Sequence, residues 1–553
     1  MKSFFFSLVL ILMICLNTDA QLLKAKQNFS RADSLRGELT PLRTCYDINY
    51  YHLKVKIDID KKFINGSNEF NFTATTDFTK LQFDLFSNFE ISKIIYQGQE
   101  LSFKREFNAV FVTFPRTIKK GSKEKFEVFY SGNPIVAIKP PWDGGFIFSK
   151  DKAGNPWVSV ACQGLGASSW WPNKDHQSDE VDSVLISISI PKSKELKEVS
   201  NGRLHSIVDQ PDGYQEYNWF VANPINNYDI TFYIGNYAHW TDNYQGENGN
   251  LTLDFWSLKE DSLLAKPHWD ADVKPMIKSF EHWFGPYPFY KDGYKLVEAP
   301  HLGMEHQSAV AYGNHFKMGY LGRDLSGTGW GLKFDFITVH ESGHEWFGNN
   351  ITAKDIADMW IHESFTNYSE SLFLESQYGK EASTAYVIGI RKNIQNDTPI
   401  IGHYNVNKEG SGDMYYKGAN MIHTIRQLIH NDERFRSILR GLNKTFYHQT
   451  VTTAQIESYI AKESGLKLSK VFDEYLRTTM VPVLSYHFNN GKLYYEWTNT
   501  TEGFDMPVKV TLKPNVFTFI YPTSKWKEVD ITEINDTNFK ADPNFYILMK
   551  KAE

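Results

Sequence analysis

The chain has 553 residues, which exceeds the size of one ordinary hydrophobic core and predicts several domains. Apolar residues make up 41% and charged residues 22% of the sequence, the balance of a soluble globular protein. The formal net charge of -6 is small for this length, so we expect no nucleic acid and no anionic membrane as a partner.

Residues 1–20 have the pattern of a secretory signal peptide. An almost unbroken apolar run from Phe4 to Leu16 is followed by "NTDA", which ends in a small residue. The run is shorter than the roughly 20 residues that span a bilayer, so we expect no integral membrane span in the mature chain. We expect cleavage after Ala20 and export to the periplasm or the medium, with lipid anchoring through Cys15 as a minor alternative.

Removal of this segment leaves two cysteines, Cys45 and Cys162. In an oxidising compartment they could pair, or they could remain as two buried thiols. The sequence leaves both alternatives open, because it does not show the distance between the two Cβ atoms.

The N-terminal part of the chain has the pattern of a β domain. From Cys45 to about Tyr237, short runs such as "YHLKVKIDI" and "KEKFEVFYSG" alternate apolar and polar residues between turns of Gly, Asn and Asp. After the predicted signal peptide, we therefore expect a large β domain at residues 21–240.

Helical patterns dominate residues 241–480. Segments such as "KFDFITVHESGHEWFG" and "YKGANMIHTIRQLIH" repeat apolar residues at intervals of three and four. Beyond them, "VLSYHFNNGKLYYEW" is typical of a hairpin that turns at Asn-Asn-Gly. Residues 481–553 are therefore expected to form a small β-sandwich, and the fold class is multidomain α+β.

The segment "TVHESGHEWFGNN" places two histidines four residues apart. On a helix, His340 and His344 lie about 40° apart around the axis and about 6 Å apart along it, so both imidazoles can reach one ion. Glu341 lies beside them, where it can address a metal-bound water without being a ligand. Two histidines with an open coordination position are typical of catalytic zinc, since structural sites are closed by four protein ligands.

A third ligand is expected from the next helical pattern. Glu363 lies in "DMWIHESFTNYSE", and the short connection "NNITAKD" lets this helix pack antiparallel to the first. Its carboxylate can then reach the same ion. Taken alone, Glu363 could be a solvated helix residue, and the histidine pair could be two polar residues on an ordinary helix.

Four segments resemble one known family. "HESGHEWFGN" followed by "WIHESFTNYSE" resembles the zinc core of the aminopeptidase N and leukotriene hydrolase family of metallopeptidases. "GMEHQ", which begins at Gly303, is similar to the family's Gly-x-Met-Glu-Asn motif, and "YYKGA", which begins at Tyr415, to its Tyr-x-Lys-Gly motif. Weaker likeness at "ACQGLGASSWWPNKD" and in the last β domain extends the resemblance over nearly the whole mature chain.

The resemblance implies a fold and a reaction. The fold would comprise a saddle-like N-terminal β-sheet domain, a thermolysin-like and mainly helical catalytic domain, and a small β-sandwich. One Zn²⁺ per chain would be bound by His340, His344 and Glu363. A zinc-bound water would attack the first peptide bond of a substrate, with Glu341 as the general base that later protonates the leaving amine.

The resemblance also assigns a tyrosine to the oxyanion of the tetrahedral intermediate. Tyr415 keeps the family's spacing to the following Lys-Gly pair, and the neighbouring Tyr416 is the competitor. For either tyrosine the alternative is an aromatic residue packed in the core.

Recognition of a free amino terminus would depend on residues outside the zinc motif. The resemblance implies that Glu305 binds the ammonium group of the peptide substrate and that Gln163 adds a second contact from the N-terminal domain. Gly303 and Met304 would line the approach of the extended substrate, and Met304 could equally be a flexible filler of the pocket wall.

The sequence departs from the family pattern at two points. His306 stands where the family usually has Asn, so we expect the support of Glu305 to differ and the amine site to depend on pH. Many members carry a further helical domain after the small β domain, whereas this sequence ends at Glu553, which leads us to expect a more open active site.

Three functions therefore compete. The leading hypothesis is a secreted zinc aminopeptidase. A thermolysin-like zinc endopeptidase would share the histidines and Glu341 but leave "GMEHQ" unexplained. A peptide-binding relative without turnover would be expected to have lost Glu341 or a zinc ligand, and all four residues are present.

Overall fold

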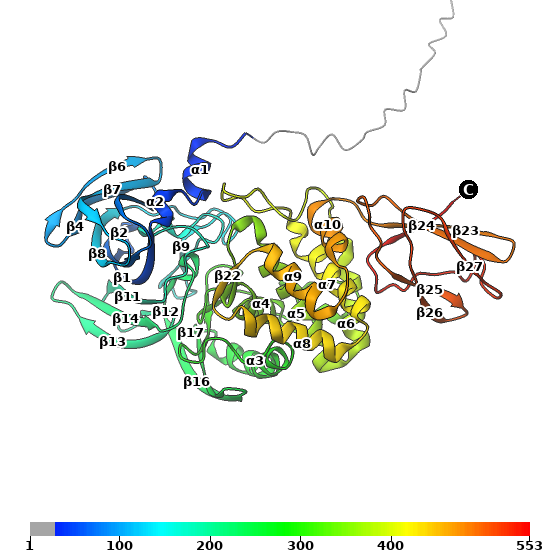
Figure 1. Cartoon of the computed structure of the whole chain (residues 1–553). Coiled ribbons are helices and arrows are strands. Elements are labelled where there is room, and N and C mark those ends of the chain that lie inside the picture. Colours follow the sequence, from blue (N-terminus) through cyan, green and yellow to red (C-terminus); the bar gives the residue numbers. More distant parts are fainter. Residues whose placement is uncertain (1–27, 553) are drawn as a thin grey trace, which may run out of the picture.

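The computed structural model describes residues 28–552, so the predicted signal peptide lies outside the described residues. Three parts follow one another in a row: N-terminal sheets, a helical central part and C-terminal sheets (Figure 1). This arrangement is the predicted multidomain α+β fold. Within residues 28–552, none of the helices has the length and apolar character that crossing a membrane requires.

The N-terminal part is built on an eight-stranded sheet. In sheet order its strands are β13 (Arg203–Asp209), β14 (Tyr214–Val221), β11 (Ser183–Pro191), β1 (Tyr46–Asp58), β2 (Phe63–Ala74), β8 (Lys123–Gly132), β4 (Phe89–Tyr96) and β5 (Gln99–Glu100). Burial alternates along β1 and β2, because successive side chains of a strand point to opposite faces.

Two smaller sheets and two short helices complete this part. One sheet holds β12 (Lys197–Ser200), β15 (Phe232–Gly235), β10 (Pro156–Ala161) and β9 (Gly145–Lys150), and the other holds β3 (Phe78–Asp84), β7 (Ala109–Ile118) and β6 (Ser102–Glu106). The helices are α1 (Arg31–Gly37) and α2 (Pro41–Thr44). The strand β10 leads directly into the segment that carries Gln163.

Cys45 and Cys162 lie in the core of the N-terminal part as free, buried thiols. The sulfur of Cys45 is 3.5 Å from the carbonyl oxygen of Leu42, and that of Cys162 is 3.6 Å from the carbonyl oxygen of Tyr228. Of the two alternatives that the sequence left open, the structure shows the buried thiols.

The central part combines a five-stranded sheet with helices. The sheet order is β16 (Tyr237–Gly246), β17 (Gly249–Leu258), β18 (Tyr294–Glu298), β20 (Val310–Tyr312) and β19 (Gly303–Met304). The α-helices are α3 (Ser262–Phe284), α4 (Phe336–Gly343), α5 (Trp360–Tyr378), α6 (Lys380–Gly389), α7 (Tyr416–Ile429), α8 (Asp432–Thr445), α9 (Thr453–Ser464) and α10 (Ser469–Arg477). A short parallel pair joins β21 (Ile351–Ala353) to β22 (Gln449–Val451).

The last strand of this sheet differs from its neighbours in direction. β17, β18 and β20 are parallel, whereas β19 pairs antiparallel with β20 at the edge of the sheet. The strand β19, which begins the segment "GM", is therefore the edge strand of this sheet.

The C-terminal part consists of short strands. A four-stranded sheet has the order β27 (Lys527–Asp530), β24 (Lys492–Thr498), β23 (Val483–Asn489) and β28 (Leu548–Lys551), and a hairpin joins β25 (Val508–Lys513) to β26 (Val516–Ile520). The predicted hairpin is confirmed: β23 and β24 turn at Asn490 and Gly491, which have φ values of 47° and 73°. Positive φ at both turn residues is the reason for the Asn-Gly pair.

The buried apolar side chains form two hydrophobic cores. One fills the N-terminal part, and the other runs from Leu251 to Phe545 through the helices and into the C-terminal strands. The predicted domain boundary after residue 240 falls within β16 (Tyr237–Gly246), the strand that begins the central sheet.

Candidate metal centre and active site

The two histidines lie at the end of a short helix. Asp335 caps α4 by accepting a hydrogen bond from the backbone N–H of Thr338, His340 lies in the last turn, and His344 follows the final helical residue. The ring centroids of the two histidines are 5.1 Å apart. The four-residue spacing thus places both imidazoles on one side of the helix, as the sequence predicted.

The chain leaves α-helical geometry directly after His344. Residues 345–349 form a wider turn in which Phe347 is non-helical and Gly348 has φ 134°, a value that favours glycine. This turn brings the carbonyl oxygen of Phe347 back to His344, whose Nδ1 donates to it over 3.0 Å. The break in the helix therefore fixes the orientation of the second imidazole.

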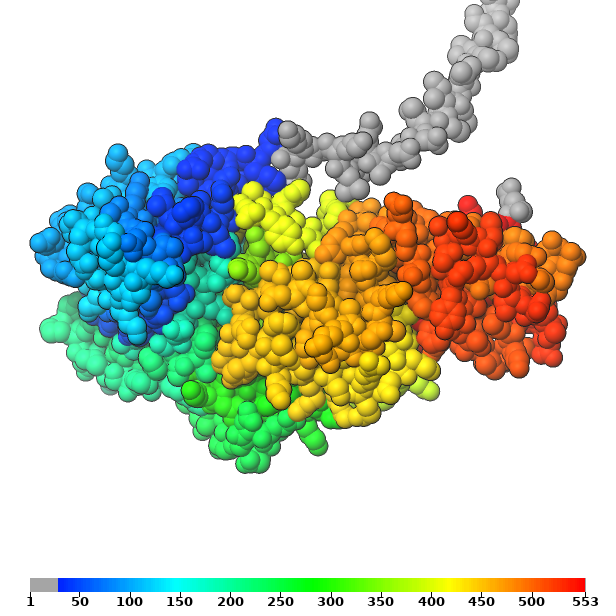
Figure 2. Space-filling view, in the orientation of Figure 1, coloured from blue at the N-terminus to red at the C-terminus, as the bar shows by residue number. Residues whose placement is uncertain are grey.

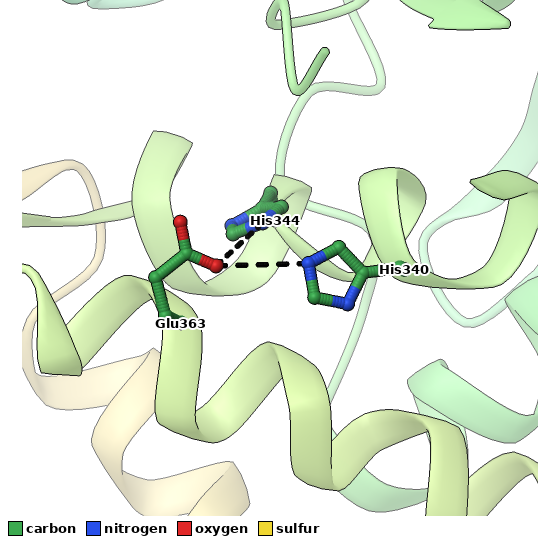
Figure 3. A group of neighbouring side chains, drawn as sticks. All are labelled: His340, His344 and Glu363. Atoms are coloured by element: carbon green, nitrogen blue, oxygen red, sulfur yellow. Dashed lines mark ion pairs between the residues drawn. The ribbon is translucent and has the colours of Figure 1, made fainter. Parts of the chain in front are cut away.

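Glu363, in the first turn of α5, faces both histidines (Figure 3). Its Oε2 lies 3.6 Å from Nε2 of His340 and 3.5 Å from Nε2 of His344. All three side chains are buried. The predicted ligands therefore converge on one point.

The carboxylate of Glu370 orients the imidazole of His340 from the side of the ring that faces away from Glu363. Nδ1 of His340 donates to Oε1 of Glu370 over 2.7 Å. Glu370 is held in turn by Asn367, which donates over 2.8 Å, and by the hydroxyl of Tyr386, which donates over 2.5 Å. Because both histidines donate through Nδ1, both direct the lone pair of Nε2 toward Glu363.

This donor set fits a divalent metal ion. One atom each of His340, His344 and Glu363 can be chosen so that all lie within 4.8 Å of one another. Oε2 of Glu363 is buried and has no hydrogen-bond partner within the described part of the chain. Two imidazole nitrogens and one carboxylate oxygen are the ligands of catalytic zinc, and a bound cation would satisfy the orphaned oxygen.

The pKa values of His344 and Glu363 show that negative charge surrounds the histidines and positive charge surrounds the carboxylate. Burial acts to lower the pKa of His344, but Glu305 and Glu363 outweigh it and raise the value to about 9. Burial acts to raise the pKa of Glu363, but His344 and His340 hold it well below its usual range. The carboxylates that stabilise protons on these imidazoles would equally stabilise a divalent cation, so metal binding and protonation compete.

Glu341 lies against β19. A Cβ atom added to Gly303 would lie 2.6 Å from Oε1 of Glu341, so only glycine allows the edge strand to approach the carboxylate this closely. Burial raises the pKa of Glu341 to about 7, while His340 and His344 act in the opposite direction. Glu341 also has an oxygen within 4.8 Å of ligand atoms of Glu305 and His344, which places it beside the metal position.

Glu305 also lies beside the metal position. Its Oε2 is 3.3 Å from Nε2 of His344. Its Oε1 accepts hydrogen bonds from the hydroxyl of Tyr228 over 2.6 Å and from the amide of Gln163 over 3.0 Å. The backbone oxygen of Glu305 accepts from Asn349, in the wide turn after the histidines, over 2.8 Å. Residues from both large parts of the chain thus build the Glu305 site.

Two residues of this site were missed by sequence reasoning. Tyr228 donates the shorter of the two hydrogen bonds to Glu305, and Nδ1 of His362 lies 3.7 Å from the same carboxylate. His362 directly precedes Glu363 in the motif "WIHESFTNYSE", so its position in the sequence could have indicated that it lies near the site. Tyr228 lies in "NNYD" within the N-terminal part, where no motif singled it out.

The surroundings of His306 contradict the pH dependence expected from it. Its ring is completely buried, its Nδ1 is 2.7 Å from the hydroxyl of Tyr233, and burial holds its pKa well below the ordinary value. Burial therefore favours the neutral imidazole, which argues against a pH dependence of the amine site through His306. The hydrogen bonds that support the Glu305 carboxylate come from Tyr228 and Gln163.

The two candidate tyrosines point to different surroundings. The ring of Tyr415 stacks beside His340 with a centroid distance of 6.0 Å. Burial, followed by the charge of Glu363, raises the pKa of Tyr415 well above its usual value. For Tyr416, burial and the charge of Glu370 raise the pKa to about 12. Tyr415 is thus the tyrosine next to the predicted ligands.

The glycine of "YYKGA" also has a structural role. A Cβ atom on Gly418 would collide with the hydroxyl of Ser364, which donates a hydrogen bond to the carbonyl oxygen of Met414 over 2.7 Å. The close approach of α7 and α5 at this point fixes Tyr415 relative to Glu363. Met304, on β19, is 6% exposed and belongs to the N-terminal core, which agrees with its packing role.

This arrangement of two histidines, a carboxylate on the following helix and a free carboxylate beside them defines the class of zinc metallopeptidases. Residues 271–475 match the Peptidase family M1 domain. The chain therefore carries an M1 peptidase domain, in agreement with the family resemblance of its motifs.

Relatives of this family resemble the chain over most of its length. The chain is 22% identical over 441 residues to the leukotriene A-4 hydrolase of Xenopus laevis, covering 75% of this chain and 68% of that protein. It is 22% identical over 422 residues to the probable aminopeptidase 2 of Sulfurisphaera tokodaii, covering 72% of this chain and 50% of that protein. The chain thus spans between about half and two thirds of these two relatives.

Solved structures share the fold. The M1 zinc metallopeptidase of Deinococcus radiodurans superposes with a TM-score of 0.63 at 19% identity, covering 76% of this chain and 90% of that chain. A mutant of that enzyme bound to a Tyr-ser-ala substrate superposes with a TM-score of 0.65 at 19% identity, covering 79% and 95%. At this identity the likeness supports the fold class of the chain.

Proposed function

We propose that this chain is a zinc-dependent aminopeptidase that removes the first residue of peptides. The observation that carries the proposal is the position of Glu305, whose Oε2 lies 3.3 Å from Nε2 of the predicted zinc ligand His344. A fixed carboxylate so close to the metal position would bind a positive group of the substrate. It would therefore select substrates in which that group lies one residue from the peptide bond to be cleaved. Only the amino terminus of a peptide carries a backbone charge at that distance.

Binding would begin at the amino end of the substrate. The ammonium group would pair with Glu305, while Gln163 and Tyr228 hold the carboxylate in place through their hydrogen bonds. The edge strand β19, with Gly303 and Met304, would align the peptide backbone in extended form.

Bound zinc would supply a Lewis acid that lowers the pKa of water to roughly 7. Glu341, which is beside the metal position and is not part of the three-ligand set, would accept the proton of the attacking water and deliver it to the leaving amine. The hydroxyl of Tyr415 would donate to the oxyanion of the intermediate. Glu370 would keep the His340 ligand in the required tautomer.

Cleavage of single residues can be tested directly. Aminoacyl anilides should be hydrolysed, and the same compounds with an acetylated amine should not. Equal cleavage of both would favour an endopeptidase, for which the position of Glu305 has no role. A purified chain without zinc and without chelator-sensitive activity would instead favour a peptide-binding relative.

We also propose that the chain is exported and acts in the periplasm or the medium, on the strength of the apolar run near its start. Fractionation of cells that express the full sequence, with N-terminal sequencing of the product, tests this. The expected mature chain begins at Gln21, and retention of residues 1–20 would contradict the proposal.

A further inference from the structure

Gln163, the residue expected to assist Glu305 in binding the substrate's amine, lies in a tight turn of the backbone. The backbone N–H of Gly166 donates to the carbonyl oxygen of Cys162 over 2.6 Å and closes a five-residue turn. Gly166 has φ 96°, which favours glycine. Gln163 is the second residue of this turn and donates to Glu305 over 3.0 Å. The shape of the turn therefore decides where the amide of Gln163 points.

One guanidinium group holds the turn from outside. Nη2 of Arg36, in α1, donates to the carbonyl oxygen of Gly164 over 3.1 Å and also to that of Leu165. A Cβ atom on Gly166 would lie 2.7 Å from the same nitrogen, so the guanidinium packs directly on the turn. Arg36 thus binds the two residues that follow Gln163.

The same guanidinium reaches the central part of the chain. The side-chain amide of Asn407 lies 3.1 Å from both Nε and Nη2 of Arg36, and we assign its oxygen to this side because only that orientation satisfies both the amide and the guanidinium. Asn407 belongs to the loop of residues 402–411, which ends just before Tyr415. Figure 2 shows the yellow surface of this region directly against the blue surface of α1. Arg36 therefore joins the Gln163 turn to the loop that leads to Tyr415.

Both ends of this connection are firmly attached. On the loop side, the N–H of Gly402 donates to the carbonyl oxygen of Ala357 over 2.9 Å, and the hydroxyl of Tyr404 donates to Asp358 over 2.6 Å. These partners lie just before α5, the helix that carries Glu363.

On the α1 side, Gln82 of the N-terminal part donates to the carbonyl oxygen of Leu35 over 2.9 Å, and Arg43 donates to that of Arg36 over 2.7 Å. A side chain on Gly37 would collide with the backbone of residues 406–407, so α1 and the loop are in contact. The link through Arg36 therefore runs between two anchored segments.

The chemistry of the link requires arginine. Nη2 of Arg36 lies against the uncharged carbonyl oxygens of Gly164 and Leu165, and Nε and Nη2 together form a fork that meets the amide of Asn407. A lysine would retain the positive charge, but its single ammonium group does not reproduce the fork.

We propose that Arg36 is a positioning residue for recognition of the substrate's amino terminus. By tying the Gln163 turn to loop 402–411, it holds the amide of Gln163 against Glu305 across the boundary between the two parts of the chain. This inference rests on the proposed aminopeptidase function.

A double-mutant cycle tests the inference. Arg36→Ala should raise KM for an aminoacyl anilide about tenfold and change kcat little, because binding of the amine is weakened and the groups at the scissile bond are untouched. Gln163→Ala should have a similar effect, and the double variant should be no worse than Gln163→Ala alone. Losses that multiply, or wild-type kinetics of either single variant, would overturn the inference.

Two further variants test whether the effect of Arg36→Ala comes from loss of the hydrogen-bonded link, from loss of the positive charge, or from a general disturbance of α1. Arg36→Lys should behave like Arg36→Ala, and full rescue by lysine would show that the charge alone matters. Arg31→Ala is the matched control, since Arg31 lies on the same helix but is exposed and pairs with Glu106 at the surface. It should retain wild-type KM.

A readout independent of activity keeps the two proposals distinguishable. In Arg36→Ala, amide hydrogen exchange should accelerate in residues 162–166 and 402–411 and remain unchanged in α5. Unchanged exchange in both segments would overturn the inference even in an active enzyme. If the wild type cleaves no aminoacyl anilide but exchange in both segments is still faster in Arg36→Ala than in the wild type, the role of Arg36 in holding the turn is upheld and the proposed function has failed.

Discussion

Glu370 turns the imidazole of His340 toward the metal position: Nδ1 donates to Oε1 of Glu370 over 2.7 Å, which leaves Nε2 facing Glu363. Glu370 would therefore act on a bound metal through the histidine, although it lies outside the three-ligand set.

Glu370→Ala should lower zinc affinity by about 10- to 100-fold, because the tautomer and orientation of His340 are no longer fixed. Competition with a chromogenic chelator measures the affinity. Glu370→Gln keeps an acceptor oxygen and should lose less, whereas wild-type affinity in Glu370→Ala would show that His340 does not need this support.

Glu341→Ala should retain zinc and lose about 10²- to 10⁴-fold in kcat, because a proton acceptor is removed and no ligand is. Metal analysis and turnover are measured on the same preparation. Loss of zinc together with activity would mean that Glu341 is a ligand.

Tyr415→Phe should lower kcat by about 10²- to 10³-fold with little change in KM, since the hydroxyl is expected to act on the oxyanion. Tyr416→Phe is the matched control and should stay close to wild type, because the largest charge effect on the pKa of Tyr416 comes from Glu370 and not from the predicted ligand Glu363. The reverse order of effects would exchange their roles.

Glu305→Ala should reduce the preference for a free over an acetylated amino terminus, because the charge that selects the ammonium is removed. Tyr228→Phe should raise KM in the same assay, since Glu305 loses its shorter hydrogen bond. Unchanged discrimination in Glu305→Ala would remove the main support for an aminopeptidase.

His176 should make the fold sensitive to acid. Burial, followed by the charge of Arg43, lowers the pKa of His176 from 6.5 to about 3. The neutral ring fits its site, because Nε2 donates to the carbonyl oxygen of Gly37 over 3.2 Å and Nδ1 accepts from the N–H of Ser178 over 3.1 Å. Between these two pKa values the unfolded chain binds a proton that the folded chain does not, so stability falls as the pH is lowered from 6.5 toward about 3.

Urea unfolding of the wild type and of His176→Gln across this pH window measures the effect. The unfolding midpoint of the wild type should fall more steeply with acidification than that of the variant, which carries no titrating group at this position. Parallel slopes would show that His176 contributes nothing to acid sensitivity.

Motif spacing was sufficient to predict that the side chains of His340, His344 and Glu363 converge. His340 and His344 are brought together by one turn of chain, and Glu363 follows on the next helix, so their convergence requires little knowledge of the tertiary fold. At Gly303 and Gly418 a Cβ atom would collide with Glu341 and with Ser364, respectively. The motifs that contain these glycines were informative because only glycine allows such close packing.

Features that depend on long-range contacts were missed. Tyr228 meets Glu305 only through the packing of the N-terminal part on the central part. The pH dependence expected from His306 is contradicted by its burial, which favours the neutral imidazole and has no signature in a short motif. The end of α4 at Gly343 was also unforeseen, since the wide turn depends on the positive φ of Gly348.

The shared core from Leu251 to Phe545 affects how the chain can be shortened. The C-terminal strands are not an appendage, because Tyr475 in α10 donates to the backbone of Tyr546 and His423 in α7 contacts Asn544. Deleting residues 481–553 would expose apolar surface and unsatisfied polar groups along α7 and α10, so a minimal protease trimmed to its zinc-binding part should aggregate during expression.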